Sequence, residues 1–265
     1  MLVIVLLSKL KELSSKLQAL LKLESQPVAV KLVKESSEIK GFKTPGEMKV
    51  KLAVCQTLAM SWRYGWSVAV TNEECACQVA KVIFGWLKVD LETFASAFLK
   101  CGFFKDMCAA IKGVKSSLEE CNICPHSCFA VASTPMSKAP WLPDVVLMYC
   151  NPAQSQLLAL GYSYINGDSV EIKYSGKHAS CGYAIAKTFS SKKPVLVPPG
   201  GGDKVFAACD PGHVIFALPP SLLEGVVEGI EHVRQAGVTN YPTPIFLRFE
   251  PQLPQPFREL EREVE

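Results

Sequence analysis

Apolar residues recur at helical spacing near the start of the chain. Leucines stand at positions 6, 10, 13, 17 and 20, and lysines and serines occupy many of the positions between them. Intervals of four and three residues place such leucines on one face of an amphipathic helix. The pattern predicts an N-terminal helix within residues 1–26 that ends before Pro27.

The pattern changes to alternation after this helix. Residues 27–33, Pro-Val-Ala-Val-Lys-Leu-Val, are rich in β-branched side chains, which predicts a strand entered through an edge proline. From residue 51 to residue 115 helical spacing dominates, and glycines divide the stretch. Residues 121–128 and 135–143 show no clear period, and they predict an irregular connection rich in cysteine and proline.

Strand and helix patterns alternate in the second half of the chain. A continuous apolar run at 144–149 predicts a buried strand, and Pro152 suits the first turn of a following helix. A helix near 178–189, strands at 194–197 and 214–218, and a helix at 221–235 continue the alternation. This order predicts an α/β or α+β fold, a mixed layered sheet with helices. We expect a single α/β domain over residues 27–250 and a proline- and charge-rich tail, 251–265, that frays.

Composition narrows the class of protein. The chain has 265 residues, of which 49% are hydrophobic and 20% charged, so it is able to bury a substantial core. Its most apolar stretch, at the start, is interrupted by Lys9, Lys11 and Glu12, so it does not form a membrane span. It also lacks the basic start and the small-residue cleavage site of a signal peptide. The net charge is +3 with dispersed basic residues, which disfavours nucleic acid as a partner. We expect a cytoplasmic protein that contacts neither membrane nor nucleic acid.

The chain is unusually rich in cysteine. It contains 11 cysteines, and because cytoplasmic reductants keep thiols reduced, metal binding explains them better than disulfides. The densest segment is Cys121-Asn-Ile-Cys124-Pro-His-Ser-Cys128. A Cys-x-x-Cys turn brings two thiolates to one metal or cluster, and a third cysteine nearby reaches another corner. The spacing departs from the even spacing of ferredoxins, and zinc completed by His126 or a remote cysteine is the alternative.

Other cysteines stand at the predicted starts of helices. Cys75 and Cys77 precede a helical run, Cys181 opens a helix after a polar stretch, and Cys55 is followed by Gln56 on a helix. The start of a helix favours thiolate over thiol, as a metal ligand or a nucleophile requires. His178 lies near Cys181 and is a candidate proton donor. The glycine-rich segment 199–203 offers backbone amides to an anion, although a flexible turn is its commoner role.

Several of these segments together resemble a known family. They are Pro27-Val-Ala-Val-Lys31, Cys55-Gln56, Cys75 with its helix, Pro143-Asp-Val-Val-Leu147, Asn151-Pro-Ala-Gln154 and Cys181. In these segments the chain is similar to the ArCR family, the domain of unknown function numbered 169. The resemblance runs from about residue 27 to the last helix and implies one domain without supplying an activity. It implies that Cys55, Cys75 and Cys181 lie in family-like motifs, whereas segment 121–128 is an addition.

These observations predict an iron-sulfur protein, a redox or Lewis-acid enzyme that meets a small-molecule substrate or an electron-transfer partner. The predicted metal ligands are Cys55, Cys75, Cys77, Cys121, Cys124, Cys128 and Cys181. A 4Fe-4S cluster is the expected cofactor and zinc the alternative. A cluster held by Cys55, Cys75 and Cys181 would keep one iron free for substrate, with a second or shared cluster at Cys121, Cys124 and Cys128. Gln56 and His178 are the predicted catalytic residues, and Asn151 and Gln154 are predicted to bind substrate. A non-catalytic, zinc-stabilised binding or regulatory module and a metal-free thiol enzyme are the competing hypotheses.

Overall fold

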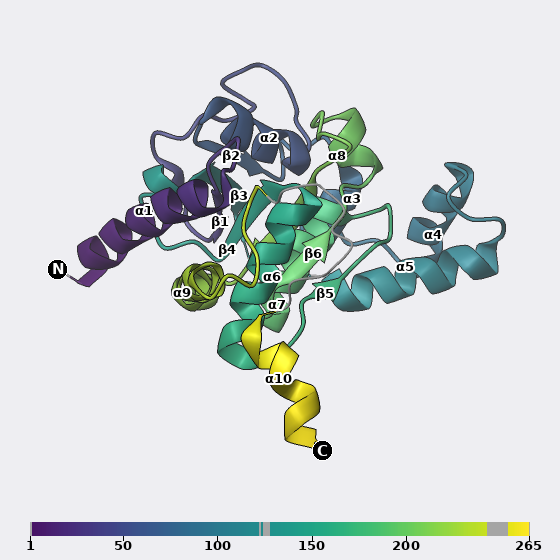
Figure 1. Ribbon diagram of the computed structural model, residues 1–265. Helices are drawn as coiled ribbons and strands as arrows, with labels where there is room; N and C mark the ends of the chain where they lie inside the picture. The colour runs from purple at the N-terminus through teal and green to yellow at the C-terminus, as the bar shows by residue number, and fades with distance from the viewer. Residues whose placement is uncertain (1, 122, 124–127, 243–253, 265) are drawn as a thin grey trace.

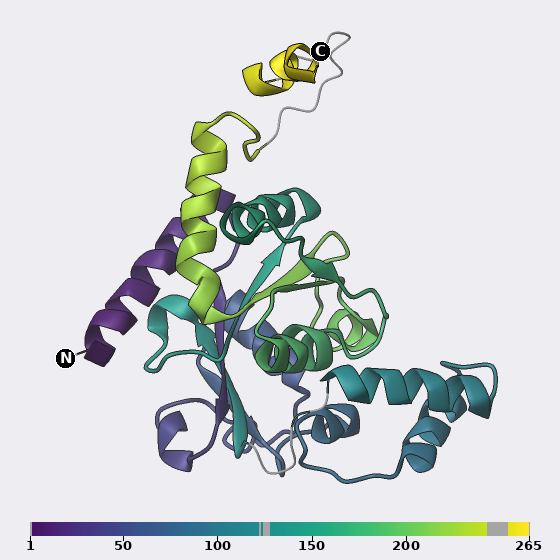
Figure 2. The ribbon, with the colours of Figure 1, turned by 90° about the horizontal axis from the view of Figure 1, so that it is seen from below.

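The computed structural model describes residues 2–121, 123, 128–242 and 254–264, and its centre is a mixed sheet with helices on both faces (Figures 1 and 2). The strands are β1 (Val28–Val33), β2 (Val68–Thr71), β3 (Ala130–Pro135), β4 (Val145–Cys150), β5 (Glu171–Ile172), β6 (Val195–Val197) and β7 (Val214–Leu218). Their order across the sheet is β2-β3-β1-β4-β7-β6-β5. Neighbouring strands are antiparallel except β5 and β6, which are parallel. The predicted fold class, a layered mixed α/β sheet, is confirmed.

The two faces of the sheet belong to different hydrophobic cores. Along β4, Val145 and Leu147 lie in one core, whereas Val146 and Met148 lie in the other, as expected for a central strand buried on both sides. The first core is covered by α2 (Val54–Tyr64), α3 (Gln78–Ile83) and the π-helix η3 (Ala179–Lys187). The second core is covered by α1 (Leu2–Leu21), α6 (Pro152–Asn166) and α9 (Leu223–Gln235).

Helices α6 and α9 cross at very close range because glycines meet at the contact. A Cβ atom placed on Gly229 would lie 2.5 Å from the carbonyl oxygen of Gly161, and one placed on Gly161 would lie 2.5 Å from the carbonyl oxygen of Val226. Both obstacles are backbone atoms, which cannot rotate away as a side chain can. The crossing therefore requires glycine, and it sets how the helix pair lies on the sheet.

A pair of helices projects from the body of the molecule (Figure 2). They are α4 (Leu91–Lys100) and α5 (Met107–Cys121). Phe94 and Phe98 of α4 pack with Ala110 and Val114 of α5, and Val82 of α3 joins this small separate core. The hairpin is therefore anchored by its own core on α3.

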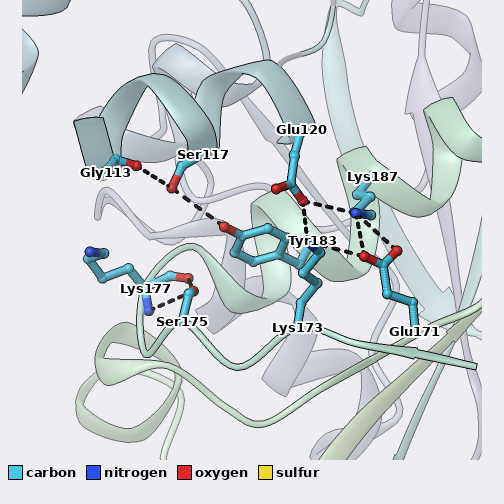
Figure 3. A network of polar contacts seen from close by, with 9 residues as sticks. All are labelled: Gly113, Ser117, Glu120, Glu171, Lys173, Ser175, Lys177, Tyr183 and Lys187. Carbon is cyan, nitrogen blue, oxygen red and sulfur yellow. Dashed lines mark hydrogen bonds and ion pairs between the residues drawn. The ribbon is translucent and has the colours of Figure 1, made fainter. Parts of the chain in front are cut away.

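An ion-pair network also fastens the end of α5 to the body (Figure 3). The carboxylate of Glu120 lies 2.7 Å from the ammonium of Lys173 and 2.9 Å from that of Lys187. Both lysines also contact Glu171, at 3.1 and 3.0 Å. Burial disfavours the charged form of Glu120, but hydrogen bonds from the two ammonium groups outweigh this and lower the pKa of the carboxyl. The network therefore stabilises the attachment of α5 while Glu120 is ionised.

Replacing Glu120 with glutamine is expected to weaken this attachment. The pKa of Glu120 is lower in the folded chain than its ordinary value of 4.5, so its contribution is present above that value and is lost as the pH falls through the lowered pKa. Glu120→Gln should reduce the free energy of unfolding by about 0.5–1 kcal/mol at neutral pH and by less in acid. Urea unfolding at the two pH values measures this difference.

Glu119 provides the matched control for this prediction. Its side chain is 66% exposed and lies 4.0 Å from the ammonium of Lys115, so Glu119→Gln should change stability very little. Equal losses in the two variants would show that the network around Glu120 adds nothing.

The sheet contains three strands that the sequence pattern did not indicate: β2, β3 and the two-residue β5. β2 interrupts the stretch 51–115, where helices were expected, and β3 directly follows the cysteine-rich segment. Both contain alanine and threonine and carry little hydrophobic period. β3 pairs with both β1 and β2, so these strands are specified by their neighbours in the sheet and not by local pattern.

The remaining elements are short or peripheral. They are η1 (Ser36–Ile39), η2 (Met136–Lys138), α7 (Thr188–Ser191), α8 (Gly201–Val205), η4 (Pro220–Leu222) and α10 (Gln255–Val264). The expected domain limits and the frayed tail stay predictions; residues 251–253 lie outside the described residues, and α10 is helical. Within the described ranges, no helix combines the length and apolar character needed to cross a membrane.

Candidate functional site

A cavity of about 450 Å³ lies between the helical hairpin and the body. Helices α3 and α4 contribute one part of its wall, and η3 and α8 contribute another. The apolar side chains on its surface include Val79, Val82, Leu87, Phe94, Phe98, Phe103 and Phe206. A concave, mostly apolar surface with few polar groups is typical of a binding site for a small molecule.

Four of the described cysteines line this cavity, and three of them, from separate elements, lie near one another; the fourth, Cys101, is exposed at the end of α4. Cys55 lies at the start of α2, Cys77 caps α3, and Cys181 lies in the first turn of η3. The sulfur of Cys77 accepts a hydrogen bond from the amide of Ala80 at 3.5 Å, and the thiol of Cys55 donates to the carbonyl of Gly202 at 3.7 Å. Folding therefore brings together thiols that lie far apart in the sequence.

Cys75 lies directly behind these three cysteines. It is 1% exposed, and its thiol donates to the carbonyl of Cys77 at 3.6 Å. Cys55, Cys77 and Cys75 all lie close enough to Cys181 to raise its pKa. The four cysteines are therefore one electrostatically coupled group, in which Cys75 is set back from the cavity.

Burial dominates the protonation of these thiols. It raises the pKa of Cys55 to about 12, with Asp203 and Cys77 adding to the effect. Burial also raises the pKa of Cys75 to about 11, and that of Cys181 well above the ordinary value. The raised pKa values keep Cys55, Cys75 and Cys181 protonated at neutral pH, which opposes a metal-free nucleophile at these positions. A metal that binds here has to displace those protons.

A buried carboxyl group, Asp203, lies beside the cysteines and was missed by sequence reasoning. It lines the cavity and is 5% exposed. One carboxylate oxygen accepts a hydrogen bond from the amide of Gly200 at 2.9 Å, and the other accepts from the hydroxyl of Ser180. Burial raises its pKa, and these hydrogen bonds only partly offset the increase. One feature of the sequence could have pointed to Asp203: it stands at the third position of a helix, where a carboxylate caps the helix start.

The element that carries Cys181 is a π-helix of 9 residues. The amide of Tyr183 donates to the carbonyl of His178, five positions earlier, at 3.0 Å. π-Helical segments are rare in proteins, and those that occur are often found at functional sites. The sequence predicted a helix here, but it did not indicate the wider type.

His178 stands at the entrance to η3 and lines the cavity. Its ring meets that of Phe98 edge-on, at 5.3 Å between centres. Its Nε2 atom is buried without a hydrogen-bond partner among the described residues. Burial, assisted by the charge of Lys177, lowers the pKa of His178 to about 4, so the imidazole is neutral at neutral pH.

The other predicted site residues cap helices. The side-chain oxygen of Gln56 accepts from the amide of Ala53 at 2.8 Å at the start of α2. Asn151 and Gln154 cap α6 reciprocally, at 2.7 and 2.9 Å, and Gln154 also donates to the carbonyl of Leu21 at 2.9 Å. None of these three side chains is among the described residues that line the cavity. Their predicted catalytic and binding roles stay predictions.

The cysteine-rich segment lies partly outside the described residues, which exclude Cys124 and His126. Cys121 ends α5 and packs against η3: a Cβ atom placed on Gly182 would lie 3.2 Å from its sulfur. Cys128 is buried, and its carbonyl accepts a hydrogen bond from the indole of Trp86 at 2.9 Å. The segment therefore begins beside the turn that carries Cys181, and its role in metal binding stays a prediction.

Among the residues with described positions, no three histidine, cysteine or acidic side chains form a group that could hold a metal ion. A zinc ion binds each sulfur at about 2.3 Å, so its thiolates converge on one point. A four-iron cluster is wider, because each thiolate binds a different iron. The two kinds of site therefore make different geometric demands on the same cysteines.

Comparison with known proteins extends the resemblance seen in the motifs. The family described as uncharacterised ArCR (DUF169) matches residues 16–229. A relative from Methanocaldococcus jannaschii, described as "Uncharacterized protein MJ0308", is 28% identical over 233 residues, which cover 86% of this chain and 96% of the relative. No solved structure matches the chain. Neither description names an activity.

Proposed function

The chain belongs to the uncharacterised ArCR family, and we propose that it is an iron-sulfur protein in which Cys55, Cys77 and Cys181 hold a 4Fe-4S cluster at the cavity. Because the family supplies no activity, the proposal rests on one observation. These three cysteines come from three elements and share the wall of one cavity.

The competing explanation is that the cysteines only fill space in the core, as free cysteine often does. Two features oppose it. Cys77 and Cys181 are half-buried and face the cavity, and the carboxyl of Asp203 is buried beside them. Burial of this carboxyl costs free energy, which its hydrogen bonds from Gly200 and Ser180 only partly offset. Both features suit a site that binds something.

A cluster held by these three cysteines would leave one iron open to a molecule in the cavity and would supply redox or Lewis-acid chemistry for a small substrate. The chain supplies the surroundings. Apolar side chains form most of the cavity wall. Burial raises the pKa of Asp203 above that of an exposed aspartate. The Nε2 atom of the neutral His178 imidazole has no hydrogen-bond partner among the described residues, which leaves it able to bond a bound molecule.

The spectrum of the protein tests the proposal. Protein purified without oxygen, or reconstituted with ferrous iron and sulfide, is expected to be brown, with a visible absorption that decreases on reduction by dithionite. Reconstitution in the presence of an iron chelator is the control. A colourless product after reconstitution contradicts the proposal.

A further inference from the structure

Lys177 contributes a positive charge to the cavity, and no carboxylate among the described residues pairs with it. It is the one lysine or arginine among the described lining residues. Its ammonium lies 4.0 Å from the centre of the Phe104 ring. The neighbouring Lys173 and Lys187 bind Glu120 and Glu171, whereas the side chain of Lys177 extends away from those carboxylates and has no ion pair within the described part of the chain (Figure 3).

This charge is partly buried. Burial lowers the pKa of Lys177, so the ammonium has lost part of its hydration without gaining a carboxylate in exchange. The contact with an aromatic ring returns only part of that loss. An anion bound in the cavity would supply the missing partner.

The walls of the cavity favour an aromatic body for that anion. Phe94, Phe98, Phe103 and Phe206 all line it. Phe103 is 54% exposed and Phe206 is 58% exposed, although large aromatic side chains gain free energy when they are covered. Aromatic rings also gain from edge-on or offset contacts with one another. A flat aromatic ligand would cover these side chains.

We propose that the cavity binds an aromatic carboxylic acid, with its ring among the phenylalanines and its carboxylate paired with Lys177. This inference rests on the proposed function, because the cavity would place the acid next to the cluster. A monoanion fits better than a phosphate ester, since one ammonium in apolar surroundings provides too few donors for a doubly charged group. The carboxylate of Asp203 is already bonded to Ser180 and Gly200, so Lys177 is left for the ligand.

Binding of naphthoate, with the neutral naphthalene methanol as its matched analogue, tests the proposal by calorimetry. Wild-type protein should bind naphthoate more tightly than the alcohol. Lys177→Met keeps the length of the side chain and removes the charge, and it should weaken naphthoate about tenfold, equivalent to about 1.4 kcal/mol, without affecting the alcohol. Phe98→Leu should weaken both ligands about threefold to tenfold.

Lys105→Met is the control, because the side chain of Lys105 is 85% exposed and it is not among the lining residues. It should bind both ligands as the wild type does. Equal affinity of the wild type for the acid and the alcohol, or no binding of either, would overturn the proposal.

Titrations on metal-free and iron-loaded protein separate this inference from the proposed function. If naphthoate binds with the expected dependence on Lys177 but the protein takes up no iron, the proposed aromatic acid ligand is supported and the proposed cluster is contradicted. If iron and sulfide are present and naphthoate does not bind, the ligand class is wrong and the cluster stands.

Discussion

Cys181→Ala is expected to abolish binding of the cluster. Cys181 lies in the first turn of η3, on the cavity wall, and its thiol is electrostatically coupled to those of Cys55, Cys77 and Cys75. Removing one of three ligands leaves two, which is too few to retain a cluster normally held by four thiolates. Iron and sulfide in anaerobically reconstituted protein should fall below about a tenth of the wild-type amounts.

Two other cysteine variants sharpen this prediction. Cys150→Ala is the matched control, because Cys150 is fully buried in the core on the opposite face of the sheet; it should lose some stability and no iron. Cys75→Ala should retain more iron than Cys77→Ala, because the thiol of Cys75 faces the carbonyl of Cys77 from behind the cavity wall. Full iron content in Cys181→Ala would contradict the proposed ligand set.

Gly229→Ala is expected to destabilise the fold strongly. Within a helix, alanine is more favourable than glycine by about 1 kcal/mol. Replacing a helical glycine with alanine therefore stabilises a protein where the added Cβ atom has free space. At Gly229 the new Cβ atom would lie 2.5 Å from the carbonyl oxygen and 2.9 Å from the Cα atom of Gly161. Helices α6 and α9 have to move apart, which should cost about 2 kcal/mol and lower the melting temperature by about 4–8 °C.

Gly201→Ala is the comparison for this result, since a Cβ atom there meets no atom within 4 Å. It should leave the melting temperature within about 2 °C of the wild type. Thermal unfolding followed by circular dichroism measures both variants. An unchanged or higher melting temperature for Gly229→Ala would mean that the crossing of α6 and α9 is looser than described.

Sequence pattern predicted the elements that are long or strongly periodic. The leucine repeat became α1, and the apolar run at 144–149 became β4, which is buried on both faces. β2 and β3 were not predicted, because their formation as strands depends on their partners in the sheet. The π-helical form of η3 was not predicted either, since a local pattern does not distinguish a wider helix from an α-helix.

The candidate site was only partly accessible from the sequence. Resemblance to a family drew attention to Cys55, Cys75 and Cys181, but only folding shows that Cys77, and not Cys75, shares the cavity with the other two. Helical spacing was predicted across residues 51–115, the stretch that contains Phe94 and Phe98. This spacing could not show that the two side chains border a cavity as well as a core, because both surfaces require the same apolar residues.

Asn151 and Gln154 were predicted to bind substrate, but their sequence context also indicates a helix cap. The order Asn151-Pro-Ala-Gln154 combines a capping residue, a proline at the first helical position and a glutamine at the third, which are the signals of a helix start. Local capping accounts for both side chains in the structure. Such a signal should be considered before a binding role is assigned.

The most direct test is the amount of iron, acid-labile sulfide and zinc per chain in protein purified from cells without oxygen. Our account predicts about four irons and four sulfides per chain for a 4Fe-4S cluster, without stoichiometric zinc. Protein with neither iron nor sulfide, or with about one zinc per chain, would contradict it.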